Sequence, residues 1–551
     1  MGMMKKFSLN TSALLLVLLF SIQINAQVTE RQKPEEWNRL VKGGRFLDRF
    51  MPISPLGKLT TETWGAEGVI PRYTDNGIED PDWSYWGGNI LKGDDGKFHL
   101  FVCRWPENSP KGHMEWPKSE VVHAVADNTM GPFKVQSVIG KGHNPEAYRM
   151  KDGRYIIYVI DGYYLAESID GPWKAGKFEF NPRDREIIEG LSNLSFVQRE
   201  DGSFVMVCRG GGIWLSKDGL SPWQQVTSKR VYPDVDGRFE DPVIWRDNVQ
   251  YNLIVNDWLG RIAFYLRSKD GVHWKVDPGE AYIPGITVYT DGTNEDWFKY
   301  ERIKIFQDEY RRAVQANFAV IDTIKWDDKT NDRHSSKNIG IPLNKGVLMT
   351  ILDEEKIDDN TKTIRVKIEA EPSFNPLTDI DVNSLHFGAP EVVNFGGGCT
   401  VSGTEPDGND LIVTFKGSNN GFRDDSFAAK LLGKDKNGKL LLGYARLPWV
   451  EYIEPILSAR LPVLNANGNL EVEVENFGQI ASKNASLKIE LVNEQETIEI
   501  ASAKIPGLNP FEKTKISMKC SKIPSEDAQL KVSITYNRKM MESLTGTLRI
   551  D

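Results

Sequence analysis

A sequence pattern repeats from residue 78 to about residue 325, and acidic residues recur at the point of this pattern where an apolar, strand-forming run begins. Asp241 and Glu301 occupy equivalent positions in consecutive repeats, and other acids lie beside this position or shortly before it. Cleavage of a glycosidic bond requires two carboxyl groups, one that donates a proton and one that acts as base or nucleophile. The candidate catalytic acids are Asp80, Asp82, Glu146, Glu189, Asp241 and Glu301.

Amide, imidazole and aromatic side chains that could hold a sugar stand at the same positions and near the ends of the following strands. Arg104 and Arg209 end the second strand of their repeats, and a guanidinium group binds a carboxylate through two hydrogen bonds. These arginines therefore bind either an anionic sugar, such as a uronic acid, or the catalytic acids themselves. The candidate substrate-binding residues are Trp86, Asn89, Arg104, His143, Asn144, Tyr163, Asn193, Arg209, Glu240, Asp257 and Trp258.

The repeating pattern is a β-hairpin followed by a third strand and a short tag. Five apolar stretches turn at Asp-Gly or a related pair, and Asp-Gly between alternating apolar runs is a strong hairpin signal. Four tags, three of them beginning Ser-x-Asp-Gly, recur at roughly 40–50 residues, the length of a four-stranded propeller blade. The turns lie at residues 95–96, 152–153, 201–202, 247–248 and 308–309, and the tags at residues 128–133, 168–173, 216–223 and 268–274.

Five hairpins predict a five-bladed β-propeller over residues 78–345, in which the first strand of each blade runs along the central axis. The start of that strand and the end of the next lie on one face of the disc, so the candidate residues of all blades line one funnel. Charged groups are costly to bury unless they are paired. A ring of them is therefore typical of a binding site rather than of a structural axis.

Two further β domains follow the propeller, so the expected fold class is all-β. Residues 346–455 alternate between strands and Gly- or Asp-containing turns, which predicts a β-sandwich. Residues 456–551 contain strictly alternating stretches, typical of half-buried antiparallel strands, and resemble a C-terminal Ig-like adhesion-type module. A stabilising spacer is the alternative role for this module. Residues 27–77 are expected to form an N-terminal extension that packs on the propeller.

Residues 1–26 predict export. Lys5 and Lys6 precede an apolar run over residues 13–20, and Asn25-Ala26 offers a small-residue cleavage site, which is the pattern of a signal peptide. We expect a periplasmic or extracellular protein. No later stretch approaches the ~20 apolar residues of a membrane-spanning helix, so no membrane span is expected.

Charge and cysteine content argue against other classes. The formal net charge is −9 with no sustained basic run, which disfavours a nucleic-acid partner because neutralising phosphates needs dense Lys and Arg. The four cysteines lack the spacing of a zinc site. Cys103 and Cys208 lie in non-adjacent repeats, so buried free thiols are expected.

Residues 70–340 resemble the five-bladed propeller glycoside hydrolases of family 43 and its relatives, families 32, 62, 68, 117 and 130. The likeness rests on Asp241-Pro242, on Glu79-Asp-Pro81, on Ile188-Glu-Gly190, and on the Asp-Gly hairpins and Ser-x-Asp-Gly-Pro-Trp tags. It implies a secreted glycosidase that acts on a terminal sugar of a plant or algal polysaccharide or oligosaccharide. It also implies that no cofactor is required, and it allows a structural calcium ion on the propeller axis that His334 contacts through water.

By position, the family pattern implies a base at Asp80 or Asp82, a supporting residue at Glu146 or Asn144, and an acid at Glu189. The chain departs from this pattern because its first repeat begins with two glycines and an asparagine. Its acids gather instead in the fourth and fifth repeats.

Two other functions are compatible with the same residues. A polysaccharide lyase would use Tyr163 or His143 as base beside a uronate neutralised by Arg104 and Arg209, whereas a phosphorylase would need more basic residues than the funnel offers. A non-catalytic glycan-binding protein would capture sugar with the propeller and attach to a surface through its C-terminal domains.

Overall fold

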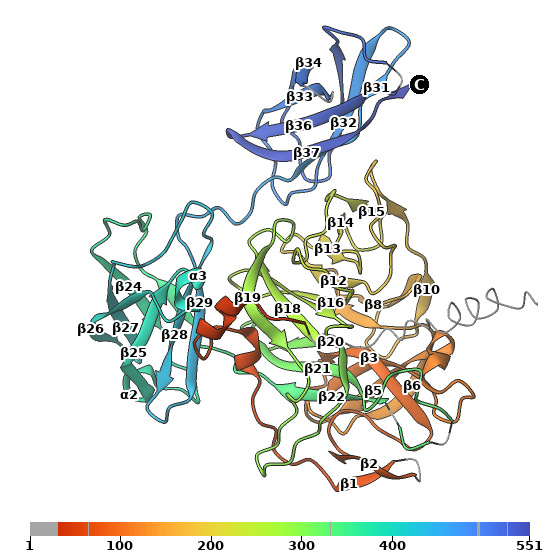
Figure 1. Cartoon of the computed structure of the whole chain (residues 1–551), viewed down its shortest axis with the longest axis vertical. Coiled ribbons are helices and arrows are strands. Elements are labelled where there is room, and N and C mark those ends of the chain that lie inside the picture. The colour runs from red at the N-terminus through yellow and green to blue at the C-terminus, as the bar shows by residue number, and fades with distance from the viewer. Residues whose placement is uncertain are drawn as a thin grey trace, which may run out of the picture.

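The computed structural model describes residues 31–63, 66–330, 332–334, 336–492, 496–525 and 527–550. Within these residues nearly all of the regular secondary structure is β-strand, which confirms the predicted all-β class. Figure 1 shows a large body of small sheets, a second β body beside it and a third body at the C-terminal end. The predicted signal peptide lies outside the described residues. Among the described helices, none has the length and apolar character needed to span a membrane.

Five small sheets make up the large body, which we call the five-sheet unit. The first sheet contains β3 (Trp83–Lys92), β4 (Phe98–Pro106), β5 (Glu120–Ala126) and β6 (Lys134–Lys141), with the 3-10 helix η3 (Gly112–Lys118) between β4 and β5. The second contains β7 (Glu146–Arg149), β8 (Tyr155–Val159), β9 (Gly162–Ala166) and β10 (Lys174–Gly176). The third contains β12 (Ser195–Gln198), β13 (Phe204–Val207), β14 (Ile213–Ser216) and β15 (Trp223–Gln225), with β11 (Phe180–Asn181) added at its edge. The fourth contains β16 (Phe239–Arg246), β17 (Tyr251–Asp257), β18 (Ile262–Ser268) and β19 (Lys275–Tyr282), and the fifth contains β20 (Lys299–Gln307), β21 (Ala313–Ile321) and β22 (Ser336–Pro342).

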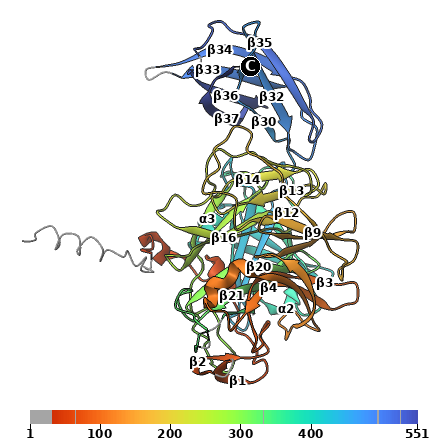
Figure 2. The ribbon, with the colours of Figure 1, turned by 90° about the vertical axis from the view of Figure 1, so that its right-hand side faces the viewer.

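The innermost strands of the five sheets form a closed ring. β3 packs against β7 and β20, and β16 packs against β12 and β20. The ring closes between β7 and β12, because Glu146 on β7 accepts a hydrogen bond from the backbone N–H of Phe196 on β12, at 3.0 Å. Figure 2 shows the unit from the side, with β12, β16 and β20 near its middle.

Most strands of this unit are buried on both faces, because each sheet packs between two neighbours. Every residue of β17 and β18 is buried. One apolar cluster between the sheets joins Trp245, Tyr265 and Phe318 from the fourth and fifth sheets. In the sequence, a strand buried on both faces is a continuous apolar run rather than an alternation of apolar and polar residues. The apolar runs of this sequence have that pattern.

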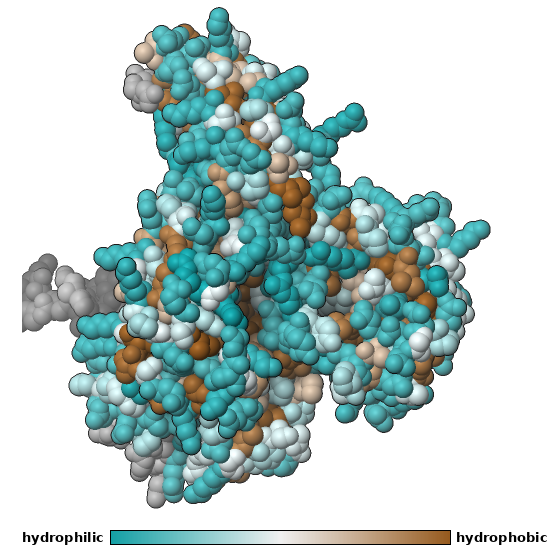
Figure 3. Space-filling model, turned by 180° about the vertical axis from the view of Figure 1, so that it is seen from behind, coloured by the Kyte–Doolittle hydropathy of each residue, from teal (hydrophilic) through white to brown (hydrophobic). Residues whose placement is uncertain are grey.

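The N-terminal segment packs against the five-sheet unit. It forms the 3-10 helices η1 (Glu35–Arg39) and η2 (Phe46–Arg49) and a hairpin of β1 (Leu59–Thr63) and β2 (Ala66–Tyr73). Phe46 lies 5.0 Å from the ring centre of Tyr265, and Trp37 belongs to the core of the fourth sheet. Seen from behind, the surface of the whole chain is mostly hydrophilic, with apolar residues scattered over it (Figure 3).

The middle unit, predicted as a β-sandwich, is one seven-stranded sheet that curls around its own core. Its edges meet, because β23 packs against β29 and Val347 bridges to Gly443. The strands are β23 (Met349–Ile351), β24 (Thr363–Ile368), β25 (Ile380–Gly388), β26 (Cys399–Asp407), β27 (Asp410–Lys416), β28 (Ala428–Asp435) and β29 (Leu440–Arg446), and the helices are α2 (Pro376–Asp379) and α3 (Pro390–Val393).

The C-terminal unit has two sheets packed over a single apolar core. The alternation predicted for its strands is visible in β32, where every second residue is buried. The strands are β30 (Leu457–Ala459), β31 (Val463–Leu464), β32 (Asn469–Asn476), β33 (Ala485–Val492), β34 (Thr497–Ile505), β35 (Lys513–Lys519), β36 (Gln529–Tyr536), β37 (Lys539–Thr547) and β38 (Arg549–Ile550).

Candidate active site

One residue at the start of each innermost strand has a left-handed backbone conformation, with φ between 51° and 61°. Glycine adopts this conformation freely, whereas for residues with a side chain, and above all for arginine, it carries a steric cost. In β3, β16 and β20 the strand ladder is irregular at the same point. Backbone strain of this kind is concentrated at functional sites. The five residues line an axial cavity of about 10 Å³ and are Gly87, Asn144, Asn193, Asp241 and Arg302.

Three carboxylates meet beside this cavity. Glu240 and Asp241 belong to β16 and Glu301 belongs to β20, and one oxygen of each lies within 4.8 Å of the other two. Asp241 and Glu301 are only 2% and 1% exposed, whereas Glu240 is half-buried. We call these residues the three-acid cluster. The structure corrects the predicted equivalence of Asp241 and Glu301: the ladder shifts follow Glu240 in β16 and Glu301 in β20, so Glu301 corresponds to Glu240, and Asp241 corresponds to Arg302. Asp241 and Glu301 nevertheless lie together because β16 and β20 are neighbours in the ring.

Two arginines pair with the acids of β16. Arg302 contacts Asp241 at 2.7 Å, and both side chains are largely buried. Arg209 contacts Glu240 at 3.2 Å, and its side chain remains 32% exposed. Arg209 was predicted to bind either an anionic sugar or a catalytic acid. The structure shows its contact with the acid Glu240, and part of the guanidinium group remains accessible.

Two lysines surround Glu301. Lys325, from the loop after β21, and Lys299, at the start of β20, both form ion pairs with its carboxylate. Each ammonium group also faces an aromatic ring: Lys325 lies 5.0 Å from the ring centre of Trp86, and Lys299 lies 4.2 Å from that of Trp258. The two predicted aromatic residues therefore flank the acids and the cations that bind them.

The surroundings of Asp241 and Glu301 move their pKa values in opposite directions. Burial raises the pKa of Asp241 to about 6, with neighbouring negative charge adding to the effect and Arg302 opposing it. Burial acts in the same sense on Glu301, but Lys325 and Lys299 outweigh it, so the pKa of Glu301 is lowered. Near neutral pH the site therefore holds one carboxyl group that is readily protonated and one that stays ionised.

His143 and Asn144 lie at the entrance of the second sheet. The hydroxyl group of Ser119 is 2.9 Å from Nδ1 of His143, and the Trp116 ring centre is 4.8 Å from the imidazole. Burial lowers the pKa of His143 well below its usual range, so the ring is neutral. Both polar atoms of the Asn144 amide are buried without a hydrogen-bond partner. Buried polar groups normally have one, and the cavity that Asn144 lines has room for about one water molecule that could supply it.

A second pair of carboxyl groups beside the entrance was not indicated by the repeat. Burial raises the pKa of Glu107, which follows β4, to about 7, and that of Asp328, in the loop after β21, to about 8. Asp328 lies next to His113, whose ring is 4.6 Å from that of Trp86. Neither acid stands at the start of a strand, so the sequence pattern contained no signal for them.

Glu146, predicted as a candidate catalytic acid, holds the ring together. Its carboxylate accepts hydrogen bonds from the backbone N–H of Phe196 at 3.0 Å and from the Ser195 hydroxyl group at 3.2 Å. It also forms an ion pair with Lys304 of β20. These contacts occupy both carboxylate oxygens, so we correct the prediction and assign Glu146 a structural role.

Three predicted binding residues also serve the fold. The Asn89 amide exchanges two hydrogen bonds with the backbone of Ala147, at 2.7 and 2.9 Å, and so joins the first and second sheets. The Asp257 carboxylate is fully buried and pairs with Arg31 at 2.5 Å. Tyr163 lies on the third strand of its sheet and packs against an apolar cluster. None of the three lines the axial cavity.

The remaining predicted residues do not belong to the three-acid cluster. Arg104 is bound to Glu120 at 2.9 Å. Asp80 accepts a hydrogen bond from the Tyr85 hydroxyl group. Two further candidate acids, Asp82 and Glu189, are exposed.

The axial cavity does not fit the calcium ion that the resemblance allows. Ca²⁺ takes six to eight oxygen ligands, whereas Asp241 is the one carboxylate that lines this cavity, and the cations Arg302 and Lys304 line it too. His334 lies instead 3.4 Å from Asp322, beyond the end of β21.

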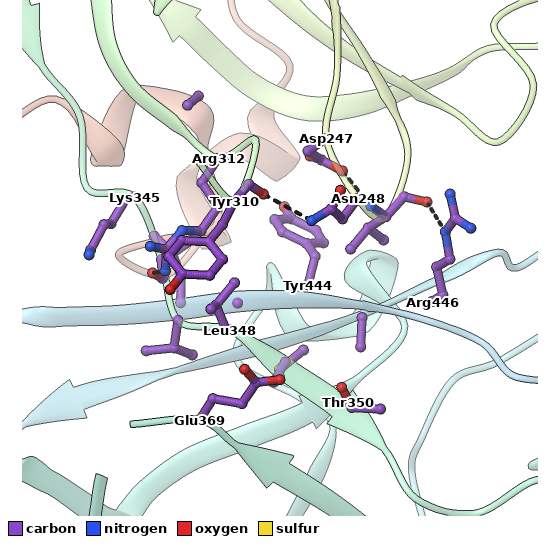
Figure 4. Close-up of a pocket in the computed structure, with 18 of the residues that line it drawn as sticks. Asp247, Asn248, Tyr310, Arg312, Lys345, Leu348, Thr350, Glu369, Tyr444 and Arg446 are labelled. Atoms are coloured by element: carbon purple, nitrogen blue, oxygen red, sulfur yellow. Dashed lines mark hydrogen bonds between the residues drawn. The ribbon is translucent and has the colours of Figure 1, made fainter. Parts of the chain in front are cut away.

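Larger hollows lie elsewhere. One of about 380 Å³ separates the five-sheet unit from the middle unit and is lined by Tyr310, Arg312 and Tyr444 (Figure 4). In it the Asn248 amide donates a hydrogen bond to the carbonyl of Tyr310, at 3.0 Å. Another of about 760 Å³ lies at the opposite end of the ring. Neither contains the three-acid cluster.

Comparison with known proteins found similarity at the level of structure. No protein-family model and no curated protein matches the chain. A solved structure described as a glycoside hydrolase has 12% identity, with 85% of this chain and 98% of that chain covered and a TM-score of 0.36. A family 43 protein from Bacillus licheniformis has 8% identity, with 85% and 78% covered and a TM-score of 0.29. An engineered family 43 glycoside hydrolase, described as displaying both endo-xylanase and exo-arabinofuranosidase activity, has 8% identity, with 85% and 91% covered and a TM-score of 0.30.

Proposed function

We propose that this chain is an exported glycoside hydrolase that removes a terminal sugar from a plant or algal polysaccharide or oligosaccharide. The five sheets act as the blades of a β-propeller over residues 78–345, and the middle and C-terminal units are accessory domains. One observation supports the activity above all: Asp241 and Glu301 lie together, and their pKa values are shifted in opposite directions. A divergence of this kind separates the proton donor of a site from its ionised partner.

In this proposal the two acids divide the work of bond cleavage. Asp241 donates its proton to the oxygen of the scissile bond, because its carboxyl group stays protonated to a higher pH than an exposed aspartate. Glu301, kept ionised by Lys325 and Lys299, acts on the opposite side as a base toward water or as a nucleophile. Its negative charge also stabilises the positive charge that develops on the sugar ring.

The closed centre of the ring supports action at a chain end. The axial cavity beside the acids has a volume of about 10 Å³, which holds about one water molecule. A polysaccharide chain therefore cannot pass along the axis, and the terminal sugar is the part of the substrate that reaches the acids.

The charges around the acids favour an anionic sugar. The three carboxyl groups of the cluster face four cationic side chains, which leaves an excess of positive charge at one place in a chain of net charge −9. Arg209 is the most exposed of the four, and a guanidinium group binds a carboxylate through two hydrogen bonds. The cations are Arg209, Lys299, Arg302 and Lys325.

Arg209→Gln is therefore expected to raise KM for a nitrophenyl uronide about tenfold while leaving KM for the matching neutral glycoside unchanged, since a hydrogen bond to a charged group contributes about 1.5–3 kcal/mol. Steady-state kinetics on both substrates measures the difference. Arg154→Gln, which removes an exposed arginine paired with Asp152 at 2.6 Å, is the control. Equal effects of Arg209→Gln on the two substrates would contradict an anionic sugar.

The pH profile follows from the two pKa shifts. The raised pKa of Asp241 means that the proton needed for catalysis is present below about pH 6 and is lost as the pH rises through that value. The lowered pKa of Glu301 keeps its carboxylate ionised to more acidic pH than usual. We expect kcat/KM to be highest on the acidic side of pH 6 and to fall about tenfold per pH unit above it. A profile that stays flat into the alkaline range would exclude Asp241 as the proton donor.

The direct test of the proposed function is product analysis with the purified chain lacking residues 1–26. Plant and algal oligosaccharides, neutral and uronate-containing, are incubated with it, and release of a single terminal monosaccharide is the expected result. Unsaturated products would show a lyase instead, and phosphate-dependent release of a sugar phosphate would show a phosphorylase. Sugar binding without any product would identify a glycan-binding protein.

A further inference from the structure

We propose that His99, His123 and Asp170 bind a divalent transition-metal ion of the zinc class between the first and second sheets. One ligand atom of each residue lies within 4.8 Å of the other two. None of the three lines the axial cavity. The metal site is therefore separate from the three-acid cluster and does not depend on the function proposed for it.

The strand register places the two imidazoles on one face. His99 lies on β4, and His123 lies on β5 directly opposite Phe101. Residues two apart on a strand share a face, so His99 and His123 both point toward the second sheet. The His123 ring stacks on Phe101 with ring centres 5.0 Å apart, which fixes its position. Asp170 approaches from the turn between β9 and β10 of the second sheet.

Counting protons shows why a cation suits this cluster. Asp95 Oδ1 lies 3.1 Å from Nε2 of His99, Nδ1 of His99 lies 2.8 Å from Nε2 of His123, and Nδ1 of His123 lies 3.8 Å from Oδ1 of Asp170. Two neutral imidazoles carry one N–H each. These two N–H groups can donate a hydrogen in only two of the three contacts. In the remaining contact a nitrogen lone pair faces a carboxylate, which is unfavourable. A cation bound between the lone pair and the carboxylate removes this unfavourable contact.

The ligand types select the metal. Imidazole nitrogens favour Zn²⁺, Cu²⁺ or Ni²⁺, whereas Ca²⁺ and Mg²⁺ favour oxygen ligands alone. Zn–N bonds of about 2.0–2.1 Å place neighbouring ligand atoms of a tetrahedral ion about 3.3 Å apart. Nδ1 of His99 and Nε2 of His123 lie 2.8 Å apart, which is a hydrogen-bond distance, so the two rings must separate by about 0.5 Å to bind one tetrahedral ion through these atoms. Asp95, which accepts the other N–H of His99, is the outer partner that metal-binding histidines commonly have.

Space for the remaining ligands is present beside the cluster. A hollow of about 480 Å³ is lined by Asp95, His99 and Asp170 together with the first tag of the repeat. Asp170 is 75% exposed in its side chain, whereas both imidazoles are buried. The site is thus rigid on its histidine side and open to water on its carboxylate side, so an ion can enter without unfolding the sheets.

The test is calorimetric titration of ZnCl₂ into chelator-treated, untagged protein. The wild-type chain is expected to bind one Zn²⁺, and CaCl₂ is expected to give no binding. Asp170→Ala should weaken Zn²⁺ binding about tenfold or more, and this exposed turn residue can be replaced without disturbing the core. His99→Gln should abolish binding, with the tryptophan emission of the variant compared with wild type to confirm its fold.

The control is His273→Ala. His273 lies 2.8 Å from Asp270 in the tag of the fourth sheet, and it is an exposed His–Asp pair without a second histidine. It should bind Zn²⁺ as the wild type does. Absence of stoichiometric Zn²⁺ binding by the wild type, or equal affinity of the wild type and Asp170→Ala, would overturn the proposed site.

Discussion

Glu301→Gln is expected to lower kcat about 10³-fold on every glycoside that the chain cleaves, with KM changed little. The amide has nearly the shape of the carboxylate but cannot act as base or nucleophile, and it brings no negative charge to the developing cation. Lys325 and Lys299 keep their positions beside it and lose only the ion pairs. The measurement is steady-state kinetics, together with calorimetric binding of the product sugar, which should persist.

Asp241→Asn separates the two catalytic roles. Loss of a proton donor slows substrates with poor leaving groups far more than substrates with an activated aryl leaving group, which needs little protonation. We therefore expect a loss of about 10²–10⁴-fold on oligosaccharides and a much smaller loss on a dinitrophenyl glycoside. Glu301→Gln should depress both equally.

The matched control for these variants is Glu309→Gln. Glu309 is exposed in the turn between β20 and β21, on the same sheet as Glu301 but at its other end. It should retain wild-type turnover. If Glu301→Gln also turned over at the wild-type rate, the three-acid cluster would not be the active site.

Arg183→Met combined with Arg185→Met is expected to release the C-terminal unit from the five-sheet unit. Both guanidinium groups are fully buried between the two units: Arg183 pairs with Glu475 of β32 at 3.1 Å, and Arg185 pairs with Glu542 of β37. Removing one partner of a buried ion pair costs about 3–5 kcal/mol, because the other charge stays buried and unpaired. The double variant should therefore expose the connection at residues 448–456.

Limited proteolysis and small-angle scattering measure this release. The variant should be cut in the connection at least about tenfold faster than the wild type, since a weakened interface populates the open form, and its radius of gyration should increase. The exposed pair Arg154–Asp152 provides the control variant Arg154→Met. Cleavage at the wild-type rate would show that apolar contacts, such as those of Phe477 in the core of the fourth sheet, hold the unit without these arginines.

The repeat and its hairpins could be predicted from sequence because they depend on short-range rules. Asp-Gly pairs mark turns through their backbone preferences, and Gly171, Gly219 and Gly271 of the tags all have the positive φ that favours glycine. The position of Asp241 and Glu301 at strand starts followed from the same pattern. These features need no knowledge of which sheets touch.

The partners of each acid could not be predicted, because they come from other sheets and from loops outside the repeat. Glu146 and Glu301 both lie near the start of an innermost strand. Glu146 is bound by Phe196 and Lys304, which join sheets, whereas Glu301 pairs with Lys325 beside two other acids. Lys325 lies in a loop without any periodic pattern. A sequence comparison of strand starts therefore cannot separate a structural acid from a catalytic one.

By itself, the sequence of this protein determined an all-β chain with a repeated strand unit and polar residues placed where each unit begins. Tertiary structure alone decided which of those residues share a site, which of them hydrogen-bond or form ion pairs between sheets, and which cations keep their carboxyl groups ionised. The physical reason is the separation in sequence of the groups that interact. Turns and strand patterns arise between near neighbours in the chain. The pKa values of Asp241 and Glu301 are shifted by burial and ion pairing, which exist only once distant strands pack together.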